Sequence, residues 1–391
     1  MKPLDNINVL EFSTMVTASL AAMMMAEQGA SVIKIEPLEL GDPMRYIGTA
    51  KGGISALFAN CNRGKQSIRI NLRAGEGREL AARLAERADV LMHNFRPGVM
   101  ERLNLGSDRL RQINPRLINM AITGFGKAGP LKDAPAYDPI IQAHAGFAAS
   151  QGTEKPVFIR NLMCDKITAY TALQAVTAAL LTRERTGEGQ HIDLSMLDAG
   201  LFFLFPDAFM NETLLDDDVI RQPRLADVAY DLTPTRDGAI ALSAATMAQR
   251  KGVLRALGLE QLISDERFST AERLTANLGE FRAILQEAFA THGTDEILAR
   301  LLELDVPAAK CLDLAGVLSQ PQLTANGTIE LCDHPLMGTM RIVRSPAEFG
   351  GRRLPPATPA PAHGEHTDAV LSALGVTADE VAKYRDSGVI A

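Results

Sequence analysis

Residues 7–36 read INVLEFSTMVTASLAAMMMAEQGASVIKIE, and this stretch decides the fold. Ile7–Phe12 is a short apolar run that predicts a strand, Val16–Glu27 predicts a helix, and Ser31–Glu36 predicts a second strand. Apolar strands separated by helices are typical of a parallel sheet that helices cover on both faces.

The same alternation continues through the first third of the chain. Further strands are predicted at Ser67–Leu72, Asp89–His93 and Arg116–Thr123, and a helix is predicted at Gly75–Arg87. Ligands of such sheets bind at the carboxyl ends of the strands, so the loops that follow the strands are the first place to look for a site.

Composition excludes several classes of protein. The 391 residues include 40 Lys and Arg against 47 Asp and Glu, a net charge of -7, which argues against a general binder of nucleic acid or of an anionic membrane. The four cysteines are far apart and fit neither a zinc site nor a disulfide framework, so we expect no metal. No segment approaches the roughly 18 apolar residues that span a bilayer, and the expected location is the cytoplasm.

One loop and a set of cations indicate an anion site. Asn94-Phe95-Arg96-Pro97-Gly98 directly follows a predicted strand, and Arg102 lies on the short helix behind it. The neighbouring strand carries Arg63, Lys65, Arg69 and Arg73. Together these cations could bind phosphates, but a solvated strand edge and an ordinary turn explain the same residues equally well.

The motif Gly124-Phe-Gly126-Lys-Ala-Gly129 matches the GxGxxG pattern of dinucleotide-binding loops and follows a predicted strand. That pattern also requires the glycines to open a helix, and Pro130 and Pro135 prevent one here. We therefore favour a glycine-rich turn over the loop of a nucleotide-dependent dehydrogenase.

Asp165 stands immediately before a long apolar run that predicts a helix to Arg185. Its carboxylate could cap the helix, or it could serve as a nucleophile that the helix end keeps ionised. From the residue alone the cap is preferred, and Asp165→Asn would then change stability little. Cys164 has no nearby histidine in the sequence to activate it, and a free cysteine is usually a small buried apolar residue.

Several longer motifs follow one another along the whole chain. They are VLEFSTMV, GASVIKIEPLELGDPMR, NRGKQSIRINL, ADVLMHNFRPGVMERLNLG, INPRLINMAITGFGKAGP, AYDPIIQAHAG, CDKITAYTALQAVTAALLTRERTGEGQHIDLSMLDA and PAPAHGEHTDAVLSALGV. In this order the sequence resembles the class III coenzyme A-transferases, the family of formyl-CoA and carnitine CoA-transferases that also includes the α-methylacyl-CoA racemases.

The resemblance implies an α/β fold: a large Rossmann-like domain with a parallel sheet, a smaller α+β domain, and an interlocked homodimer. With the acidic run at 216–218 as a linker, we expect the CoA-binding, catalytic domain at 1–210, a linker at 211–225 and the small domain at 226–330. Residues 331–391 would then link back and return the carboxyl end to the large domain.

The resemblance also implies roles for single residues. Asp165 matches the catalytic aspartate, which reverses the preference for a helix cap, and Tyr137 belongs to the substrate pocket. The expected CoA contacts are Val16, Thr17, Ala18, Asn71, Leu72, Arg73, Asn94, Phe95 and Arg102. The implied reaction moves CoA from an acyl-CoA to a free carboxylic acid through a mixed anhydride and an aspartyl-CoA thioester, with CoA as substrate and no permanently bound cofactor.

Two alternatives stay open. A racemase pairs its aspartate with the histidine of a Gly-His-Asp motif, whereas this chain has Ala136-Tyr137-Asp138, as the transferases do. His144 is a poor substitute, because seven residues along a helix correspond to roughly 10.5 Å. The second alternative is a protein that binds CoA without catalysis.

Overall fold

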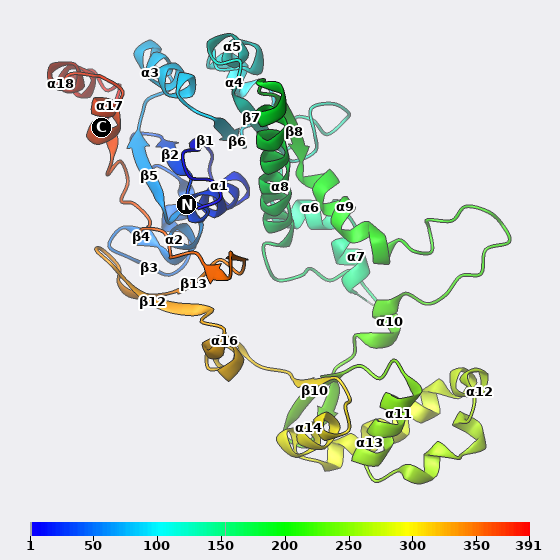
Figure 1. The fold of residues 1–391 in the computed structure, drawn as a ribbon. Helices are drawn as coiled ribbons and strands as arrows, with labels where there is room; N and C mark the ends of the chain where they lie inside the picture. The colour runs from blue at the N-terminus through cyan, green and yellow to red at the C-terminus, as the bar shows by residue number, and fades with distance from the viewer. Residues whose placement is uncertain (1, 153) are drawn as a thin grey trace. The chain divides into compact units, whose positions relative to one another are not determined.

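A six-stranded parallel sheet forms the centre of the amino-terminal part of the chain, with the strand order β5-β2-β1-β6-β7-β8. The computed structural model describes residues 2–152 and 154–391 (Figure 1). The strands are β1 (Asn8–Phe12), β2 (Ser31–Glu36), β5 (Lys65–Arg69), β6 (Val90–His93), β7 (Ile118–Thr123) and β8 (His191–Ser195). The predicted α/β fold with a parallel sheet is confirmed.

One face of this sheet packs against α1 (Thr17–Glu27), α8 (Met163–Thr186) and α9 (Met196–Ala208). Helix α1 has apolar residues on all sides because it lies between the sheet and α8. Its fully buried alanines, among them Ala18 and Ala21, have side chains small enough for the close approach of the two helices.

The opposite face packs against α3 (Gly75–Glu86), α5 (Ser107–Ile113), α17 (Thr367–Ala373) and α18 (Ala378–Asp386). The last two helices belong to the carboxyl-terminal segment, so residues far apart in the sequence share one core. The strand predicted at Ser67–Leu72 ends at Arg69 instead, because Ile70 pairs with Ile390 of that returning segment.

By its internal contacts the chain divides into unit 1, Met1–Pro206 with Leu323–Ala391, and unit 2, Asp207–Gln322. The other elements of unit 1 are η1 (Pro43–Tyr46), β3 (Ala50–Lys51), β4 (Ile54–Ser55), α2 (Ala56–Asn62), α4 (Val99–Arg102), α6 (Asp138–His144), α7 (Phe147–Gln151), β12 (Ile329–His334), β13 (Gly338–Val343), β14 (Glu348–Phe349) and β15 (Arg352–Arg353). The short helix α16 (Pro321–Ala325) lies at the boundary of the two units.

Unit 2 has its own small core around a three-stranded antiparallel sheet, β11-β10-β9. Its strands are β9 (Thr233–Thr235), β10 (Gly238–Leu242) and β11 (Ala308–Lys310), and its helices are α10 (Leu225–Ala229), α11 (Met247–Ala256), η2 (Glu260–Ile263), η3 (Glu266–Phe268), α12 (Ala271–Ala276), α13 (Leu278–Thr291), α14 (Thr294–Glu303) and α15 (Leu314–Leu318). Across both units, none of the helices in the described part of the chain combines the length and the apolar character that crossing a bilayer requires.

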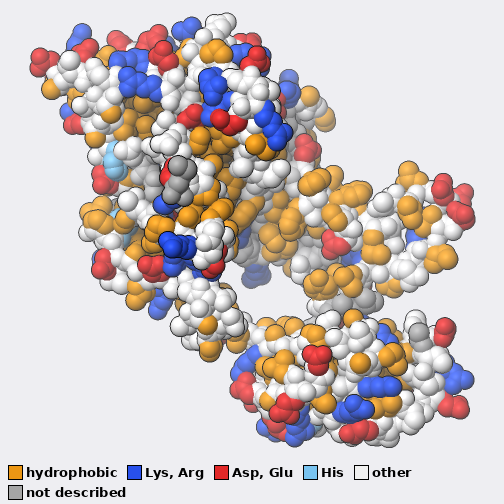
Figure 2. Space-filling model, viewed as in Figure 1, with side chains coloured by type: hydrophobic (Ala, Val, Ile, Leu, Met, Phe, Trp, Pro, Cys, Tyr) orange, Lys and Arg blue, Asp and Glu red, His pale blue; other side chains and the backbone are white. Residues whose placement is uncertain are grey.

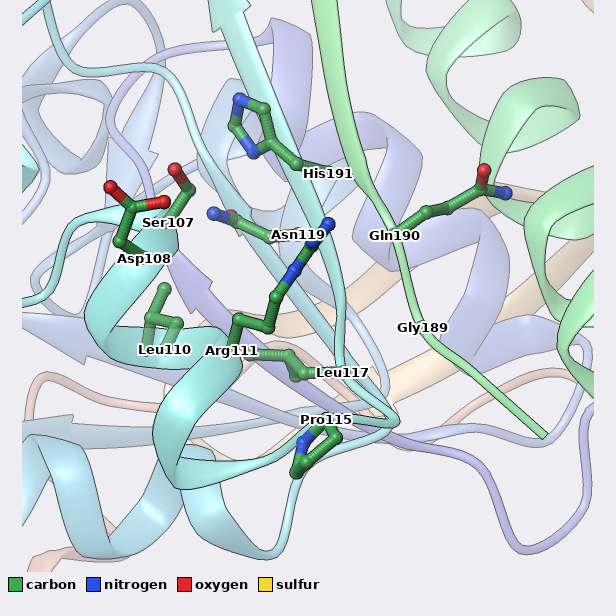
Figure 3. Close-up of a pocket in the computed structure, with 10 residues that line it drawn as sticks. All are labelled: Ser107, Asp108, Leu110, Arg111, Pro115, Leu117, Asn119, Gly189, Gln190 and His191. Atoms are coloured by element: carbon green, nitrogen blue, oxygen red, sulfur yellow. The ribbon is translucent and has the colours of Figure 1, made fainter.

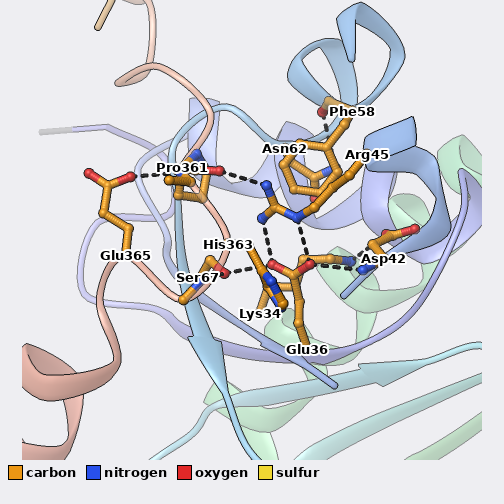
Figure 4. Close-up of polar contacts among 12 residues, drawn as sticks. Lys34, Glu36, Asp42, Arg45, Phe58, Asn62, Ser67, Pro361, His363 and Glu365 are labelled. Carbon is orange, nitrogen blue, oxygen red and sulfur yellow. Dashed lines mark hydrogen bonds and ion pairs between the residues drawn. The ribbon is translucent and has the colours of Figure 1, made fainter. Parts of the chain in front are cut away.

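A buried ion pair joins the carboxyl-terminal segment to the sheet (Figure 4). The guanidinium of Arg45 donates to both carboxylate oxygens of Glu36, at 2.8 and 2.6 Å, and to the carbonyl oxygen of Pro361 at 3.1 Å. It also lies 3.8 Å from the centre of the Phe58 ring. Burial opposes the charge of Glu36, but the hydrogen bonds and the charge of Arg45 outweigh it and lower the pKa of Glu36 to about 2.

Arg45→Met should lower the free energy of unfolding by about 3–5 kcal/mol, because it leaves the buried Glu36 carboxylate without its ion-pair partner. Urea denaturation at neutral pH measures this. The matched control is Arg385→Met, since Arg385 forms an exposed ion pair with Asp368 and its loss should cost less than about 1 kcal/mol. Equal effects of the two substitutions would show that the Arg45 ion pair does not hold the carboxyl-terminal segment in place.

Candidate active site

A pocket of about 390 Å³ opens at the carboxyl ends of β1, β6 and β7, within unit 1. Its walls come from the loops Thr14–Thr17 and Asn94–Pro97, from the end of β7, and from Tyr137 and Asp165. This is the edge at which open parallel sheets bind their ligands, and the volume lies in the range of roughly 300–1,000 Å³ that is typical of small-molecule sites.

A second, smaller pocket of about 120 Å³ lies next to α5, near the amino ends of β7 and β8 (Figure 3). Arg111, Asn119 and His191 line it, together with residues of the neighbouring turns. It contains none of the site residues predicted from the sequence, and its volume is below the range of roughly 300–1,000 Å³ expected for a small-molecule site. A pocket of about 310 Å³ at the amino ends of β1 and β2 reaches that range, but none of the predicted site residues lines it. The pocket of about 390 Å³ is therefore the candidate active site.

Asp165 is the third residue of α8, and Leu162 occupies the N-cap position without a capping side chain. The interpretation of Asp165 as a helix cap is therefore wrong. Its backbone amide donates a hydrogen bond to Oδ2 of Asp138 at 3.0 Å, while its side chain lines the pocket. Among the described residues, none donates a hydrogen bond to the Asp165 carboxylate, which leaves that group available to a ligand.

The surroundings of Asp165 favour its protonated form. Burial raises the pKa of Asp165, the charge of Asp138 raises it further, and together they bring it to about 7. The same two influences act on the neighbouring thiol: burial and both carboxylates raise the pKa of Cys164 to about 12. Cys164 is fully buried and stays protonated at neutral pH, so it is not a thiolate nucleophile.

Hydrogen bonds hold the loop after β1 in place beside the pocket. The Asn94 side chain accepts from the Thr14 amide at 3.1 Å and donates to the Thr14 carbonyl at 2.6 Å and to Thr17 Oγ1 at 3.1 Å. Met15 has a φ of 61°, an uncommon conformation for a residue with a side chain, and its amide donates to Asp42 Oδ1 at 3.1 Å. Both walls of the pocket are thus fixed by the protein itself.

The start of α1 offers backbone amides to the pocket. Its N-cap residue, Val16, provides no side-chain cap, and Val16 and Thr17 both line the pocket. Free amides at a helix start, with the positive end of the helix dipole, favour binding of an anion such as a phosphate.

The family model for CoA-transferase family III matches residues 4–367. The chain belongs to CoA-transferase family III. It is an enzyme, a CoA-transferase, and enzymes of this class act on CoA thioesters.

Relatives match the chain over nearly its whole length. The succinate–glutarate CoA-transferase of Agrobacterium fabrum is 32% identical over 388 residues, which cover 95% of this chain and 96% of that protein. The formyl-CoA:oxalate CoA-transferase of Escherichia coli O6:H1 is 30% identical over 419 residues and 99% of both chains. The crystal structure of a CaiB/BaiF family protein from Brucella suis matches with a TM-score of 0.83 and 31% identity, over 95% of this chain and 99% of that one.

Of the residues that the family resemblance assigned to the site, six line the pocket together. They are Val16, Thr17, Asn94, Phe95, Tyr137 and Asp165. The other five, Ala18, Asn71, Leu72, Arg73 and Arg102, lie outside its lining. Ala18 is fully buried, backbone included.

Two of these five residues are held by hydrogen bonds that lead to the returning carboxyl-terminal segment, Asn71 directly and Arg73 through Asn71. The Asn71 amide donates to the carbonyl of Val389 at 2.8 Å, and Asn71 Nδ2 donates to that of Gly388 at 3.1 Å. Asn71 Oδ1 accepts from the backbone amide of Arg73 at 3.1 Å. The side chains of Arg73 and Arg102 are exposed to solvent.

The suggestion that Arg63 and Lys65 help to bind phosphates is wrong. Arg63 Nε pairs with Glu27 at 2.5 Å, and Lys65 Nζ pairs with Glu11 at 2.7 Å, in buried surroundings. Sequence reasoning also missed Lys132, which lines the pocket from the long turn after β7. A single lysine in a turn carries no pattern that marks it as a pocket residue.

Asp165→Asn should stabilise the protein at pH values above 7. The pKa of Asp165 is raised from 3.8 to about 7 in the folded state, so the folded state binds the proton more tightly than the unfolded chain. The contribution of the Asp165 carboxyl group to stability therefore falls as the pH rises from 3.8 towards 7. Above that range, removing the carboxylate should raise the free energy of unfolding by on the order of 1–4 kcal/mol.

Thermal and urea unfolding on both sides of this pH range measure the effect. The gain should shrink towards pH 4 and disappear below roughly pH 3, where Asp165 is protonated in both states. Asp379→Asn is the matched control, because Asp379 lies in the first turn of α18 but is exposed, and it should show no such pH-dependent gain. Unchanged stability of Asp165→Asn at every pH would mean that Asp165 is not held in an unfavourable site.

Proposed function

We propose that this enzyme is an acyl-CoA:carboxylate CoA-transferase in which Asp165 carries the acyl group and then CoA covalently. The observation that carries the proposal is the position of the Asp165 carboxylate: it lines the pocket at the ligand-binding edge of the sheet and has no protein partner among the described residues. The family membership supplies CoA thioesters as the substrates on which it acts. Among the described residues that line the pocket, Asp165 is the one carboxylate.

The reaction would proceed by four acyl transfers. An Asp165 oxygen attacks the thioester carbonyl, the carbon–sulfur bond breaks, and a mixed anhydride and CoA thiolate form. The thiolate then attacks the Asp165 carboxyl carbon, which releases the donor acid and leaves an aspartyl-CoA thioester. The acceptor carboxylate attacks this thioester to form a second anhydride, and the thiolate attacks its acyl carbon to give the new acyl-CoA and free Asp165.

CoA would bind along the walls that the sequence indicated. Val16 and Thr17 line the pocket at the start of α1, where helix amides suit a phosphate group, and Phe95 lines the pocket beside them. Because the Asn94 side chain is already bonded to the protein, its contact would come through its backbone. Arg102, Arg73, Asn71 and Leu72 would meet the parts of CoA outside the pocket.

Asp165→Asn should lower CoA transfer by several orders of magnitude, since a neutral amide cannot form the anhydride. With succinyl-CoA supplied and the acceptor acid withheld, hydroxylamine should inactivate the native enzyme and leave a hydroxamate at Asp165 that mass spectrometry detects. Succinyl-CoA is the first donor to test because one relative is a succinate–glutarate CoA-transferase; a panel of other acyl-CoA donors follows.

Cys164→Ala is the matched control, because Cys164 neighbours Asp165 but is buried and protonated, and transfer should persist in it. A label on Cys164, or transfer by Asp165→Asn, would refute the mechanism. Rapid exchange of the α-hydrogen of a 2-methylacyl-CoA in deuterated water, without an acceptor acid, would instead identify a racemase. Binding of CoA with no turnover of any donor would favour a non-catalytic protein.

We also propose that two copies of the chain form the interlocked homodimer of the family. Helix α9 exposes a row of large apolar side chains, and Figure 2 shows hydrophobic side chains exposed over this region. Phe202 is 82% exposed and Phe203 is 55% exposed. Exposed apolar surface of this kind marks an interaction site, and its continuity with the core helices of unit 1 favours a second copy as the partner.

Light scattering at dilute concentration should give the mass of two chains, and dissociation should coincide with unfolding. Phe202→Ser should weaken the dimer, whereas Tyr384→Ser, on α18 at the other face of the sheet, should not. A well-folded monomer of the native chain would contradict the dimer proposal and leave the catalytic proposal untouched.

A further inference from the structure

Asp138 is a buried carboxylate whose two oxygens both face other parts of the protein. It is the first residue of α6 and is 3% exposed. Oδ2 accepts the backbone amide of Asp165 at 3.0 Å, and Oδ1 accepts from Nε2 of Gln142 at 2.6 Å. It does not line the pocket, so it acts on the site only through Asp165.

Gln142 fixes the orientation of Asp138. Its side chain is 2% exposed, its Nε2 donates to the carbonyls of Ile159 and Asn161 at 3.0 Å each, and its Oε1 accepts from the Ile159 amide at 3.0 Å. Ile159 and Asn161 lead directly into α8. One turn of α6 is thereby joined to the chain on both sides of the point where α8 begins.

The start of α8 depends on this external support. Its N-cap residue, Leu162, has no side chain that can accept a hydrogen bond from the first helical amides. Asp138 fills that role from another helix, on the amide of the residue whose side chain enters the pocket.

We propose that Asp138 is a positioning residue for Asp165: its carboxylate fixes the backbone at the start of α8, and its negative charge strengthens the neighbouring carboxylate as a nucleophile. The inference rests on the proposed covalent role of Asp165 and adds a second residue to it.

The charge of Asp138 matters because of what else surrounds Asp165. The start of a helix favours an ionised carboxylate, and a carboxylate that loses its proton easily is a weak nucleophile. Burial and the Asp138 charge act in the opposite direction and raise the pKa of Asp165 to about 7. The other titratable groups around the pocket and beside Asp165 are Tyr137, His144, Cys164, Lys166, Lys132 and Arg96. Among the charged groups of the described residues, Asp138 is the one that raises the pKa of Asp165.

Two variants separate the charge of Asp138 from its hydrogen bond to Gln142. Asp138→Asn keeps an oxygen for the Asp165 amide but removes the charge and turns an NH2 group towards Gln142. Gln142→Met removes the same Asp138–Gln142 hydrogen bond and keeps the charge. Both variants lose the Asp138–Gln142 bond, and Gln142→Met also loses the bonds of Gln142 to Ile159 and Asn161. Only Asp138→Asn loses the charge.

The rate of acylation by succinyl-CoA, trapped as hydroxamate, is measured in single turnovers on both sides of pH 7. In the native enzyme and in Gln142→Met, this rate should rise with pH through the same midpoint. In Asp138→Asn the midpoint should move to lower pH by on the order of one unit, because the like charge is gone. Above the midpoint its rate should be roughly threefold below that of Gln142→Met, because nucleophilicity falls with pKa at a Brønsted slope of about 0.5.

A midpoint that is unchanged in Asp138→Asn, or shifted equally in Gln142→Met, would show that Asp138 is only structural. If Asp138→Asn does not fold, Asp138→Ser removes the same charge in a smaller side chain and is compared with Gln142→Met in its place. A measurement without substrate distinguishes the two proposals. The infrared band of the protonated Asp165 carboxyl group is identified as the band that Asp165→Asn lacks. In Asp138→Asn this band should titrate at lower pH than in the native enzyme. If the native enzyme gives no hydroxamate but this band still moves, the covalent mechanism fails while the role of Asp138 stands.

Discussion

The buried ion cluster around Glu11 is the constraint on which the pocket depends. Glu11 lies on β1 and is completely buried, and it contacts Lys34 Nζ and Lys65 Nζ at 2.7 Å each. Lys34 also pairs with Asp42 at 3.0 Å and donates to the Ser13 carbonyl at 2.8 Å. Burial opposes the charge on Glu11, but the two lysines outweigh it and lower its pKa to about 2. Each of these buried charges needs its partners in place, because a buried charge that loses its partner destabilises the fold strongly.

That arrangement reaches the site through a few backbone contacts. Lys34 holds the Ser13 carbonyl, and Asp42 holds the amide of Met15 in its left-handed conformation. From the other side, Asn94 bonds both backbone groups of Thr14. The loop that precedes α1 is therefore fixed between two strands before any ligand arrives, and the energy of a bound substrate need not be used to order it.

Much of the fold could be predicted from local pattern, and the parts that could not share one physical reason. Short apolar runs identified β1, β2 and β6 with small errors at their ends, because a strand covered on both faces is apolar along its whole length. The same reasoning assigned Arg63 and Lys65 either to a phosphate site or to a solvated strand edge, whereas both are buried in ion pairs. A charged residue is expected at the surface unless a partner of opposite charge is known. Here the partners, Glu27 and Glu11, are distant in the sequence, so local pattern could not reveal them.

The site shows the same division. The position of Asp165 near a helix start could be read from the sequence, but its role as a cap could not be excluded until Leu162 was seen in the N-cap position. The acceptor that does serve the helix, Asp138, comes from a separate helix 27 residues earlier. A helix that capped itself with Asp165 would tie up the carboxylate that faces the pocket. By taking the hydrogen bond from a neighbouring helix, the fold leaves the Asp165 carboxylate without a donor among the described residues and holds it in surroundings that disfavour its charge. In the proposed mechanism, the burial that makes this residue costly to the folded state would also make it reactive.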